Sequence, residues 1–311
     1  MLVYGPVPSR RLGRSLGVNH VPPKTCSYSC VYCQLGRTDH MICDRRKFYE
    51  PTTIAEQVET KLAKITDEVD YITFVPDGEP TLDVNIGKEI EAVNSLGAKT
   101  AVICNASLIW RKDVRDDLLK ADWVSLKVDA VTEDMWRRVD RPHGSLKLES
   151  ILNGIHRFKE EYTGTLTTET MLVDGFNDED EPEHIAEYLH ELEPDISYVA
   201  IPTRPPAEKW VHPAKEEAVN RAYQVFSRVL DKVEYLIGYE GNEFSSSGDF
   251  EEDILSITSV HPMREDGVDD LIHSDDASWS EVDRLIREDK LVELDYQENR
   301  FYMRRISSRS N

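Results

Sequence analysis

The sequence predicts an α/β fold in which a partial barrel of six β/α units is followed by a small winged-helix-like α+β domain. Short segments rich in Val, Ile, Thr and Tyr alternate with helical segments from about residue 50 to 240. The alternation stops at a Ser- and Gly-rich stretch, and a different order of elements follows it. We therefore place the barrel at 1–242, a linker at 243–249 and the winged-helix-like domain at 250–311.

Length and composition fit two ordinary globular domains. The chain has 311 residues, and a domain takes roughly 150. With 40% hydrophobic and 31% charged residues, disorder, collagen and a disulfide-built mini-protein are excluded. A net charge of −22 argues against a general nucleic-acid binder, which needs surplus Lys and Arg.

No membrane segment or export signal is predicted. No stretch reaches the roughly 18 apolar residues of a membrane helix. The Arg10-Arg11 pair lacks the apolar segment that an export signal requires. We therefore expect a cytoplasmic protein that begins with irregular chain.

The β/α units follow one another along the chain. In the first predicted helix, Ile54, Val58, Leu62 and Ile65 recur three and four residues apart, which places them on one face. Repeated β/α alternation builds a parallel sheet with helices outside, and chemistry then collects in the loops that follow the strands. The predicted strands are 16–21, 69–76, 98–105, 122–130, 165–173 and 195–202. The predicted helices are 53–65, 84–96, 111–121, 148–162, 183–193 and 214–233.

The first strand is followed by Cys26, Cys30 and Cys33 in a C-x3-C-x2-C run. Three thiolates from one loop can bind a soft metal centre, and thiolates select zinc or iron–sulfur clusters. Structural zinc would need a fourth ligand, for which His20 and His40 are candidates. A cluster with three protein ligands leaves one iron open for a substrate or cofactor. The position after the first strand of the series favours the cluster.

Polar residues also follow the next three strands. They are Asp77, Gly78, Glu79 and Pro80 after the second, Asn105 after the third, and Ser125, Lys127 and Asp129 on the fourth. Each group has a purely structural alternative. Gly and Pro favour a tight turn, Asn105 can cap the next helix, and Lys127 and Asp129 lie on one face, where they can form a salt bridge. Their occurrence at successive strand ends favours a shared site.

The cysteine loop, with Tyr32 before its last cysteine, resembles the signature of the radical S-adenosylmethionine (radical SAM) superfamily. The similarity extends over about residues 15–240. It implies that Cys26, Cys30 and Cys33 hold one [4Fe–4S] cluster, which reductively cleaves S-adenosylmethionine to a 5′-deoxyadenosyl radical that abstracts hydrogen from a substrate. The cofactor-binding residues that it implies are Tyr32, Asp77, Gly78, Glu79, Pro80, Asn105, Ser125, Lys127 and Asp129.

The resemblance also implies a low-potential electron donor of flavodoxin or ferredoxin type and anaerobic function in the cytoplasm. Cys43 and Cys104 are too few to hold a second cluster, so one cluster is predicted. We expect Cys104 to be a core residue.

Segments 5–13, 24–26 and 34–38 resemble a branch commonly grouped with wyosine-type tRNA-modifying enzymes. Wyosine synthases use an additional cluster built from cysteines upstream of the radical loop, and this sequence has none before Cys26. RNA modification therefore remains one alternative, beside modification of a protein or peptide. A further alternative is a non-catalytic regulator that binds zinc or an iron–sulfur cluster.

Two arginines in Pro-flanked loops, Arg141 and Arg204, are candidates for binding an anionic substrate or the carboxylate of the cofactor, because guanidinium pairs bidentately with carboxylates and phosphates. The alternative is that both are surface arginines. Residues 1–50 have eight Lys/Arg and three Asp/Glu, whereas the rest of the chain is strongly acidic. This basic segment around the cysteine loop also predicts an anionic ligand.

The last sixty residues read as three helices and a hairpin, which is the order of a winged helix. Eight Lys/Arg against sixteen Asp/Glu favour a protein-binding or architectural domain over a DNA-binding one. The expected partners are therefore a protein or peptide at this domain, with RNA possible and neither DNA nor membrane favoured. The predicted helices are 251–260, 267–274 and 278–290, and the predicted strands are 290–296 and 300–306.

Overall fold

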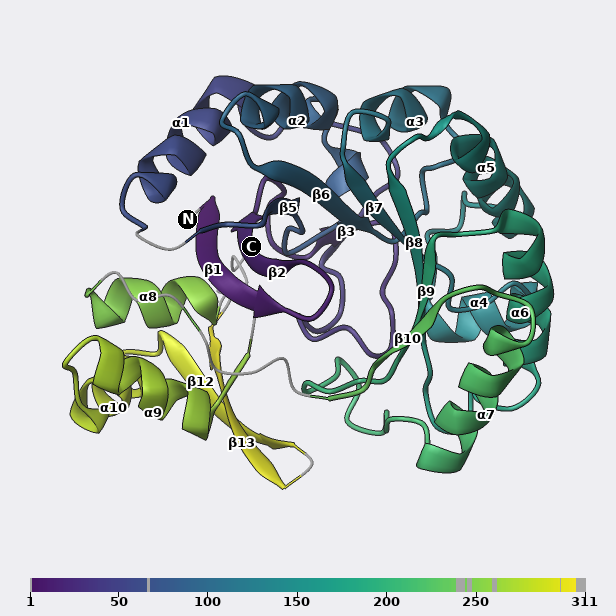
Figure 1. Cartoon of the computed structure of the whole chain (residues 1–311). Coiled ribbons are helices and arrows are strands. Elements are labelled where there is room, and N and C mark those ends of the chain that lie inside the picture. The colour runs from purple at the N-terminus through teal and green to yellow at the C-terminus, as the bar shows by residue number, and fades with distance from the viewer. Residues whose placement is uncertain are drawn as a thin grey trace.

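The computed structural model describes residues 2–65, 68–238, 244, 248–258, 262–296 and 298–305. Its largest element is an open, curved sheet (Figure 1). The strands of this sheet are β1 (Val3–Ser9), β2 (Gly13–Val18), β5 (Tyr71–Phe74), β6 (Lys99–Cys104), β7 (Trp123–Lys127), β8 (Thr165–Met171), β9 (Ile196–Ala200) and β10 (Val233–Leu236). They lie in this order; β1 is antiparallel to β2, and the others are parallel. The predicted α/β partial barrel is confirmed.

Helices cover the outer side of this sheet (Figure 1). On the predicted face of the first helix, Ile54 and Val58 are fully buried and pack in one core with Leu16, Ile72 and Val102 of the strands. No helix among the described residues is long and apolar enough to cross a membrane. The helices of the barrel are α1 (Pro51–Leu62), α2 (Ile86–Asn94), α3 (Lys112–Leu118), α4 (Glu133–Val139), α5 (Leu148–Glu161), α6 (Glu181–Leu192) and α7 (Glu216–Ser227).

The inner face of the sheet changes from apolar to charged toward the carboxyl ends of the strands. Ala101, Trp123 and Tyr198 belong to a small apolar core on this face. Farther along, the register places Lys127 of β7 beside Glu169 of β8. A charged layer therefore forms where the strands of a β/α fold carry their chemistry.

The N-terminus is not irregular, as the sequence predicted, but forms the hairpin β1–β2. The turn of this hairpin crosses the inner side of the barrel toward β8 and β9 (Figure 1). There Arg11 forms an ion pair with Glu169, and Leu12 packs with Tyr198. The prolines in β1 favour irregular chain by pattern, but an edge strand tolerates proline because one of its sides needs no ladder hydrogen bonds.

Two other elements differ from the expectation. Residues 228–233 continue the helical pattern of α7, yet the helix ends at Ser227 and the chain enters β10. The short α4 was not predicted and lies between β7 and α5. At β10, pairing with β9 overrides the local helical pattern.

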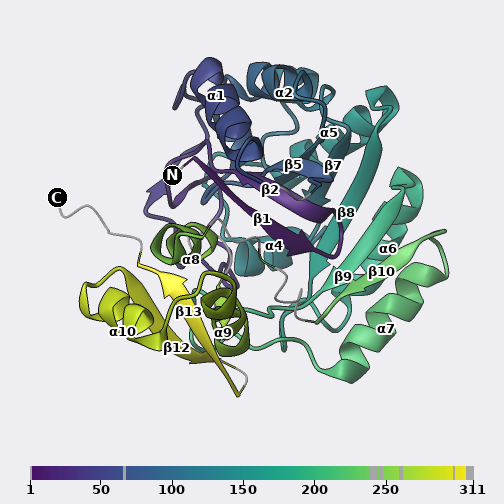
Figure 2. The same ribbon diagram turned by 60° about the vertical axis from the view of Figure 1, so that its left-hand side comes forward.

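The C-terminal region forms a second unit with its own core, in which Phe250, Ile254, Leu271 and Leu285 are buried. It contacts the barrel where α8 lies against β1 (Figure 2) and where Lys61 lies 3.9 Å from Asp253. The helices and hairpin appear as predicted, with β11 added. The domain limits and the winged-helix assignment stay predictions, and most of 243–249 lies outside the described residues. Its elements are α8 (Phe250–Ile257), β11 (Met263–Arg264), α9 (Glu265–Ser274), α10 (Trp279–Arg287), β12 (Leu291–Tyr296) and β13 (Asn299–Arg304).

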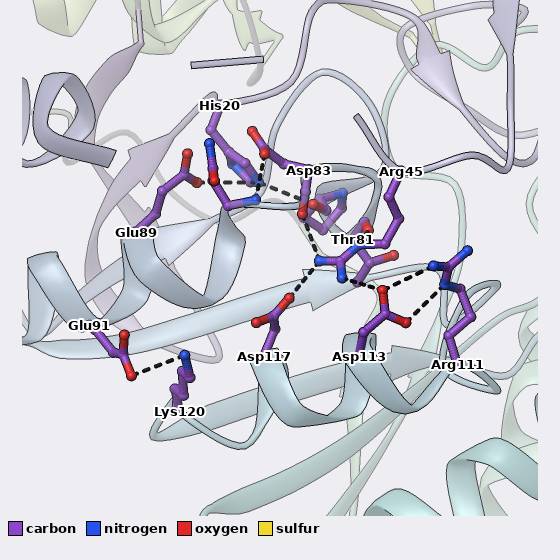
Figure 3. Close-up of polar contacts among 12 residues, drawn as sticks. His20, Arg45, Thr81, Asp83, Glu89, Glu91, Arg111, Asp113, Asp117 and Lys120 are labelled. Atoms are coloured by element: carbon purple, nitrogen blue, oxygen red, sulfur yellow. Dashed lines mark hydrogen bonds and ion pairs between the residues drawn. The ribbon is translucent and has the colours of Figure 1, made fainter. Parts of the chain in front are cut away.

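A polar cluster around the buried Arg45 side chain joins the loop that follows β5 to α3 (Figure 3). The Arg45 side chain donates to the carbonyl oxygens of Thr81 at 2.9 Å and Asp83 at 2.7 Å. It also pairs with Asp113 and Asp117 of α3, so this guanidinium ties the loop to the helix. Arg45 belongs to the basic N-terminal segment, but its charge is balanced within the fold by the carboxylates of Asp113 and Asp117.

Beside Arg45, His20 and Glu89 are both fully buried (Figure 3). The Nε2 atom of His20 lies 3.2 Å from the carbonyl oxygen of Pro80 and 4.0 Å from Oε2 of Glu89. Burial lowers the pKa of His20 to about 4 and, with a contribution from Asp83, raises that of Glu89 to about 9. Both side chains are therefore neutral near pH 7.

We predict that Gly154→Ala in α5 destabilises the protein by about 1–3 kcal/mol, because overpacking carries a penalty of that size. A Cβ at this position would lie 2.6 Å from the backbone nitrogen of Trp110. Propensity alone predicts the opposite sign, since Ala is favoured over Gly in a helix by about 1 kcal/mol. Thermal or urea unfolding measures the change. Gly144→Ala is the control, because no atom lies within 4 Å of its added Cβ. A stabilised Gly154→Ala variant would contradict the packing of α5.

We predict that Glu89→Gln stabilises the protein more at about pH 8 than at about pH 5. The unfolded carboxyl ionises near pH 4.3, whereas the folded one stays protonated to about pH 9. Folding therefore takes up a proton in this window, and stability falls as pH rises through it. Unfolding measured across pH tests this. Glu91→Gln, at an exposed site on the same helix, is the control, and an unchanged pH slope in Glu89→Gln would refute the neutral carboxyl.

Candidate functional site

The cysteine loop packs directly against the loop that follows β5. The backbone N–H of Glu79 donates to the carbonyl oxygen of Thr25 at 3.0 Å. A Cβ on Gly78 would lie only 2.2 Å from that same oxygen, which is backbone and cannot rotate away. Glycine is therefore required at 78 by the close approach of two loops.

Glu79 and Asn105 join three strand ends. One oxygen of the Glu79 carboxylate accepts from the N–H of Thr81 at 3.0 Å and the other from the N–H of Asn105 at 2.9 Å. The Asn105 amide donates to the sulfur of Cys26 at 3.4 Å and to Ser27 at 3.0 Å. Its oxygen accepts from the N–H of Ser107 at 2.9 Å within a local turn; the helix cap considered from the sequence is not formed, because the next helix, α3, has Arg111 at its N-cap position. Both residues thus fix the cysteine loop.

The other side of the cysteine loop lies against residues 139–143, where α4 ends. Val31 donates to the carbonyl oxygen of Val139 at 2.9 Å, and His143 donates to that of Ser27 at 2.9 Å. The Cys30 thiol lies 3.4 Å from Oδ1 of the buried Asp140. The pKa of Asp140 is raised well above its usual value, mainly by burial and secondly by the negative charge of Asp129.

The three cysteines have the donor chemistry of an iron–sulfur site. They belong to one loop, and burial, reinforced by Glu79, raises the pKa of Cys26 to about 12. The pKa values of Cys30 and Cys33 are raised as well, with burial as the largest cause. These partly buried thiols become thiolates when a cation supplies the opposing charge. Three soft donors with one position left open fit a [4Fe–4S] cluster.

The zinc alternative finds no support in the positions of the two histidines. His20 faces Pro80 and Glu89, and His40 is exposed in the short strand β4 (His40–Met41), which pairs with β3 (Thr25–Cys26). Within the described ranges, no group of three or more His, Cys, Asp and Glu side chains, the three cysteines included, is arranged to hold a single metal ion. A [4Fe–4S] cluster makes a different demand, because each of its three protein thiolates binds a different iron.

The inner face beside the cysteines carries a network of buried charges. Lys127 Nζ lies 2.9 Å from Glu169, 3.4 Å from Asp129 and 4.9 Å from the centre of the Tyr32 ring. The Tyr32 hydroxyl donates to Asp129, and Arg11 pairs with the second oxygen of Glu169. Burial lowers the pKa of Lys127, but Asp129 and Glu169 outweigh it and hold the pKa above its usual value. The predicted Lys127–Asp129 contact is therefore present within a larger network.

In the part of the chain that the structure describes, two predicted cofactor residues have buried polar atoms with no hydrogen-bond partner. Asp77 is held by Asn19, which donates from its amide at 2.7 Å, but its Oδ1 atom is buried and has no hydrogen bond. The hydroxyl of Ser125 is likewise buried without a partner. Burial raises the pKa of Asp77 to about 6, despite the hydrogen bond from Asn19. Unsatisfied buried polar atoms are costly, so each of these two atoms fits a polar ligand that completes it.

Asp77 also lines a cavity of about 130 Å³ between the β1–β2 hairpin and the sheet. Arg204 lines the same cavity and donates to Gln34 at 2.9 Å. Arg141 has a different partner, Glu208 at 2.6 Å, which also accepts two hydrogen bonds from Arg37. Side-chain hydrogen bonds from Arg37 and Arg141 lower the pKa of Glu208 to about 2. The two candidate substrate arginines thus have different partners.

Sequence reasoning missed Asp140, Glu208 and Arg11 as members of this region. Asp140 and Glu208 lie in loops that were singled out, but no local signal showed that their carboxylates face a cysteine or two arginines. Arg11 belongs to the basic N-terminal segment from which an anionic ligand is predicted, but its partner is Glu169, which it reaches across the barrel. Glu169 lies on the inward-facing side of its strand together with Thr167 and Met171, and this two-residue alternation could have indicated it.

Comparison with known proteins gives concordant results. The radical SAM superfamily matches residues 21–189. A UPF0026 protein of Methanocaldococcus jannaschii is 46% identical over 99% of this chain and 97% of its own. A structure of TYW1 with a lysine–pyruvate adduct has a TM-score of 0.54 and 18% identity, covering 69% of this chain and 73% of that one. A radical SAM methyltransferase from Sphaerobacter thermophilus has a TM-score of 0.54 and 15% identity, covering 72% and 66%.

The last two similarities show a shared fold and no more. The family match covers more than half of the chain, and its boundaries include the cysteine loop and the strand ends described above. Together with the M. jannaschii relative, it shows that this chain belongs to the radical SAM superfamily.

Proposed function

We propose that the protein is a radical SAM enzyme with a single [4Fe–4S] cluster, held by Cys26, Cys30 and Cys33. When bound, the cluster and S-adenosylmethionine supply a 5′-deoxyadenosyl radical that abstracts hydrogen from a substrate. The observation that carries the proposal is the close packing of the cysteine loop on the loop of Asp77–Pro80, with no space for a side chain at Gly78.

Residues around the cysteine loop support this function because they hold the loop and its thiols in position. Asn105 holds the sulfur of Cys26, and Glu79 anchors the backbone of Asn105, so the loop that bears the thiols is fixed before any ligand binds. The unpartnered oxygens of Asp77 and Ser125 would accept hydrogen bonds from the amino or hydroxyl groups of S-adenosylmethionine. Tyr32, Lys127 and Asp129 would complete the polar wall of the site.

The substrate is proposed to be anionic or macromolecular. Support comes from Arg204 at the cavity beside Asp77. The basic N-terminal segment supports it less than its composition suggests, because Arg11, Arg37 and Arg45 each pair with carboxylates. The likeness to TYW1 is one of fold, so RNA modification is not the favoured reaction.

The proposal predicts that anaerobically reconstituted protein releases 5′-deoxyadenosine when S-adenosylmethionine and dithionite are added. Chromatography of the products measures it. Cys30→Ala should lose the cluster, seen as loss of iron, sulfide and visible absorbance, and should release none. Cys43→Ala is the matched control, because Cys43 lies outside the loop and should leave the iron content unchanged.

Two results would contradict the proposal. A wild-type protein that holds the cluster but never cleaves S-adenosylmethionine would point to the non-catalytic regulator. Retention of a full cluster in Cys30→Ala would mean that the ligands have been assigned wrongly.

We further predict that Gly78→Ala binds S-adenosylmethionine about tenfold more weakly, which corresponds to about 1.4 kcal/mol of binding free energy, because the added Cβ overpacks and displaces the two loops that shape the site. The cluster should still assemble, since the cysteines are untouched. Equilibrium binding to the reconstituted protein measures the affinity, with Gly144→Ala as the control. Wild-type affinity in Gly78→Ala would show that the close approach at Thr25 does not shape the cofactor site.

A further inference from the structure

An exposed group of arginines and aromatic rings covers the cysteine loop. Phe176 and Trp210 stack with ring centres 5.2 Å apart and an interplanar angle of 22°. Arg138 lies 5.0 Å from the centre of the Phe176 ring, and Arg141 lies 5.8 Å from that of Trp210. Arg37 belongs to the same group because it pairs with Glu208, as Arg141 does. We name these five residues the arginine–aromatic face.

This face rests directly on the segment between Cys30 and Cys33. Val31 is fully buried and packs with Val173 and Val211, and Phe176 and Tyr32 border the same apolar cluster. The backbone N–H of Glu208 donates to the carbonyl oxygen of Val31 at 3.3 Å. A protein bound to the face would therefore sit next to the loop that bears the thiols.

The face is exposed and positive on an acidic protein. The side chain of Arg37 is 71% exposed and that of Arg138 is 47% exposed, while Trp210 retains 46% of its surface. Three guanidiniums are opposed by the carboxylates of Glu208 and Asp134, which leaves one excess positive charge. The chain as a whole carries −22. An acidic partner is thus repelled by most of the molecule but attracted here.

We propose that the arginine–aromatic face is the docking surface for an acidic one-electron-transfer protein that carries a flavin or an iron–sulfur centre. This inference rests on the proposed function. In the step, the donor protein loses one electron and the cluster gains it, and no proton or bond is exchanged between the two proteins. Trp and Arg carry much of the binding energy in protein interfaces. Electron-transfer encounters bury little surface, under about 1,200 Å², so docking does not require a large apolar interface.

Single-stranded RNA is the other macromolecule that stacks on aromatic and arginine side chains. It is disfavoured here because one excess positive charge neutralises far too few phosphates for single-strand binding, which depends on a positively charged groove that follows the backbone.

Direct binding of an oxidised acidic flavodoxin or ferredoxin tests the docking surface without turnover. Isothermal titration at low salt should give an affinity about tenfold or more weaker for Arg138→Glu and for Trp210→Ser than for the wild type. Arg287→Glu makes the same charge change at an exposed position on α10 and should leave the affinity unchanged. A loss confined to Arg287→Glu would place the donor on the C-terminal unit and overturn the proposal.

Reduction of the reconstituted cluster, followed by its visible absorbance, separates this inference from the proposed function. With the protein donor, the cluster of Arg138→Glu should be reduced about tenfold more slowly than the wild-type cluster. The difference between the two rates should shrink as the salt concentration rises. With dithionite, which needs no docking surface, both should be reduced at similar rates. Equal rates with the protein donor, or binding of single-stranded RNA but not of the donor, would refute the docking surface. No cleavage of S-adenosylmethionine with dithionite would instead refute the proposed function.

Discussion

The site depends on one constraint, which is the close packing of the cysteine loop against the ends of β5 and β6. Gly78 lets two backbones meet where a Cβ would overlap Thr25. Asn105 then reaches the sulfur of Cys26, and Glu79 holds Asn105. The loop of residues 139–143 closes the other side. Because each neighbour comes from a different β/α unit, the parallel sheet must form before the thiols have fixed positions.

Buried charge is the second organising feature, and it is arranged in pairs. Lys127 lies between Asp129 and Glu169, and Arg11 takes the remaining oxygen of Glu169. Taking these groups out of water carries a large desolvation penalty, which only close opposite charges offset. The hairpin β1–β2 therefore does more than extend the sheet, because its turn supplies the cation that completes this network. His20 and Glu89 avoid the desolvation penalty in another way, because both side chains remain neutral.

The sequence predicted the β/α series and the cysteine loop well, and it failed where local pattern and tertiary pairing conflict. The helix faces were correct because burial of Ile54 and Val58 follows a spacing visible within one segment. β1 was missed because its prolines suggest irregular chain, and β10 because its first residue continues a helical pattern. Lys127 and Asp129 were expected to meet and do so at 3.4 Å. Their neighbours Glu169 and Asp140 were not identified individually.

By itself, the sequence determined the fold class, the order of the units and the residue types at the strand ends. These depend on periodicities of two and 3.6 residues and on the spacing of three cysteines, all of which are local. Only the tertiary structure decided which charges pair. Arg11 and Glu169 are 158 positions apart, Arg37 and Glu208 are 171, and Cys30 and Asp140 are 110. Partners at such separations are chosen by how the sheet curves and where its loops meet, and no short-range pattern carries that information.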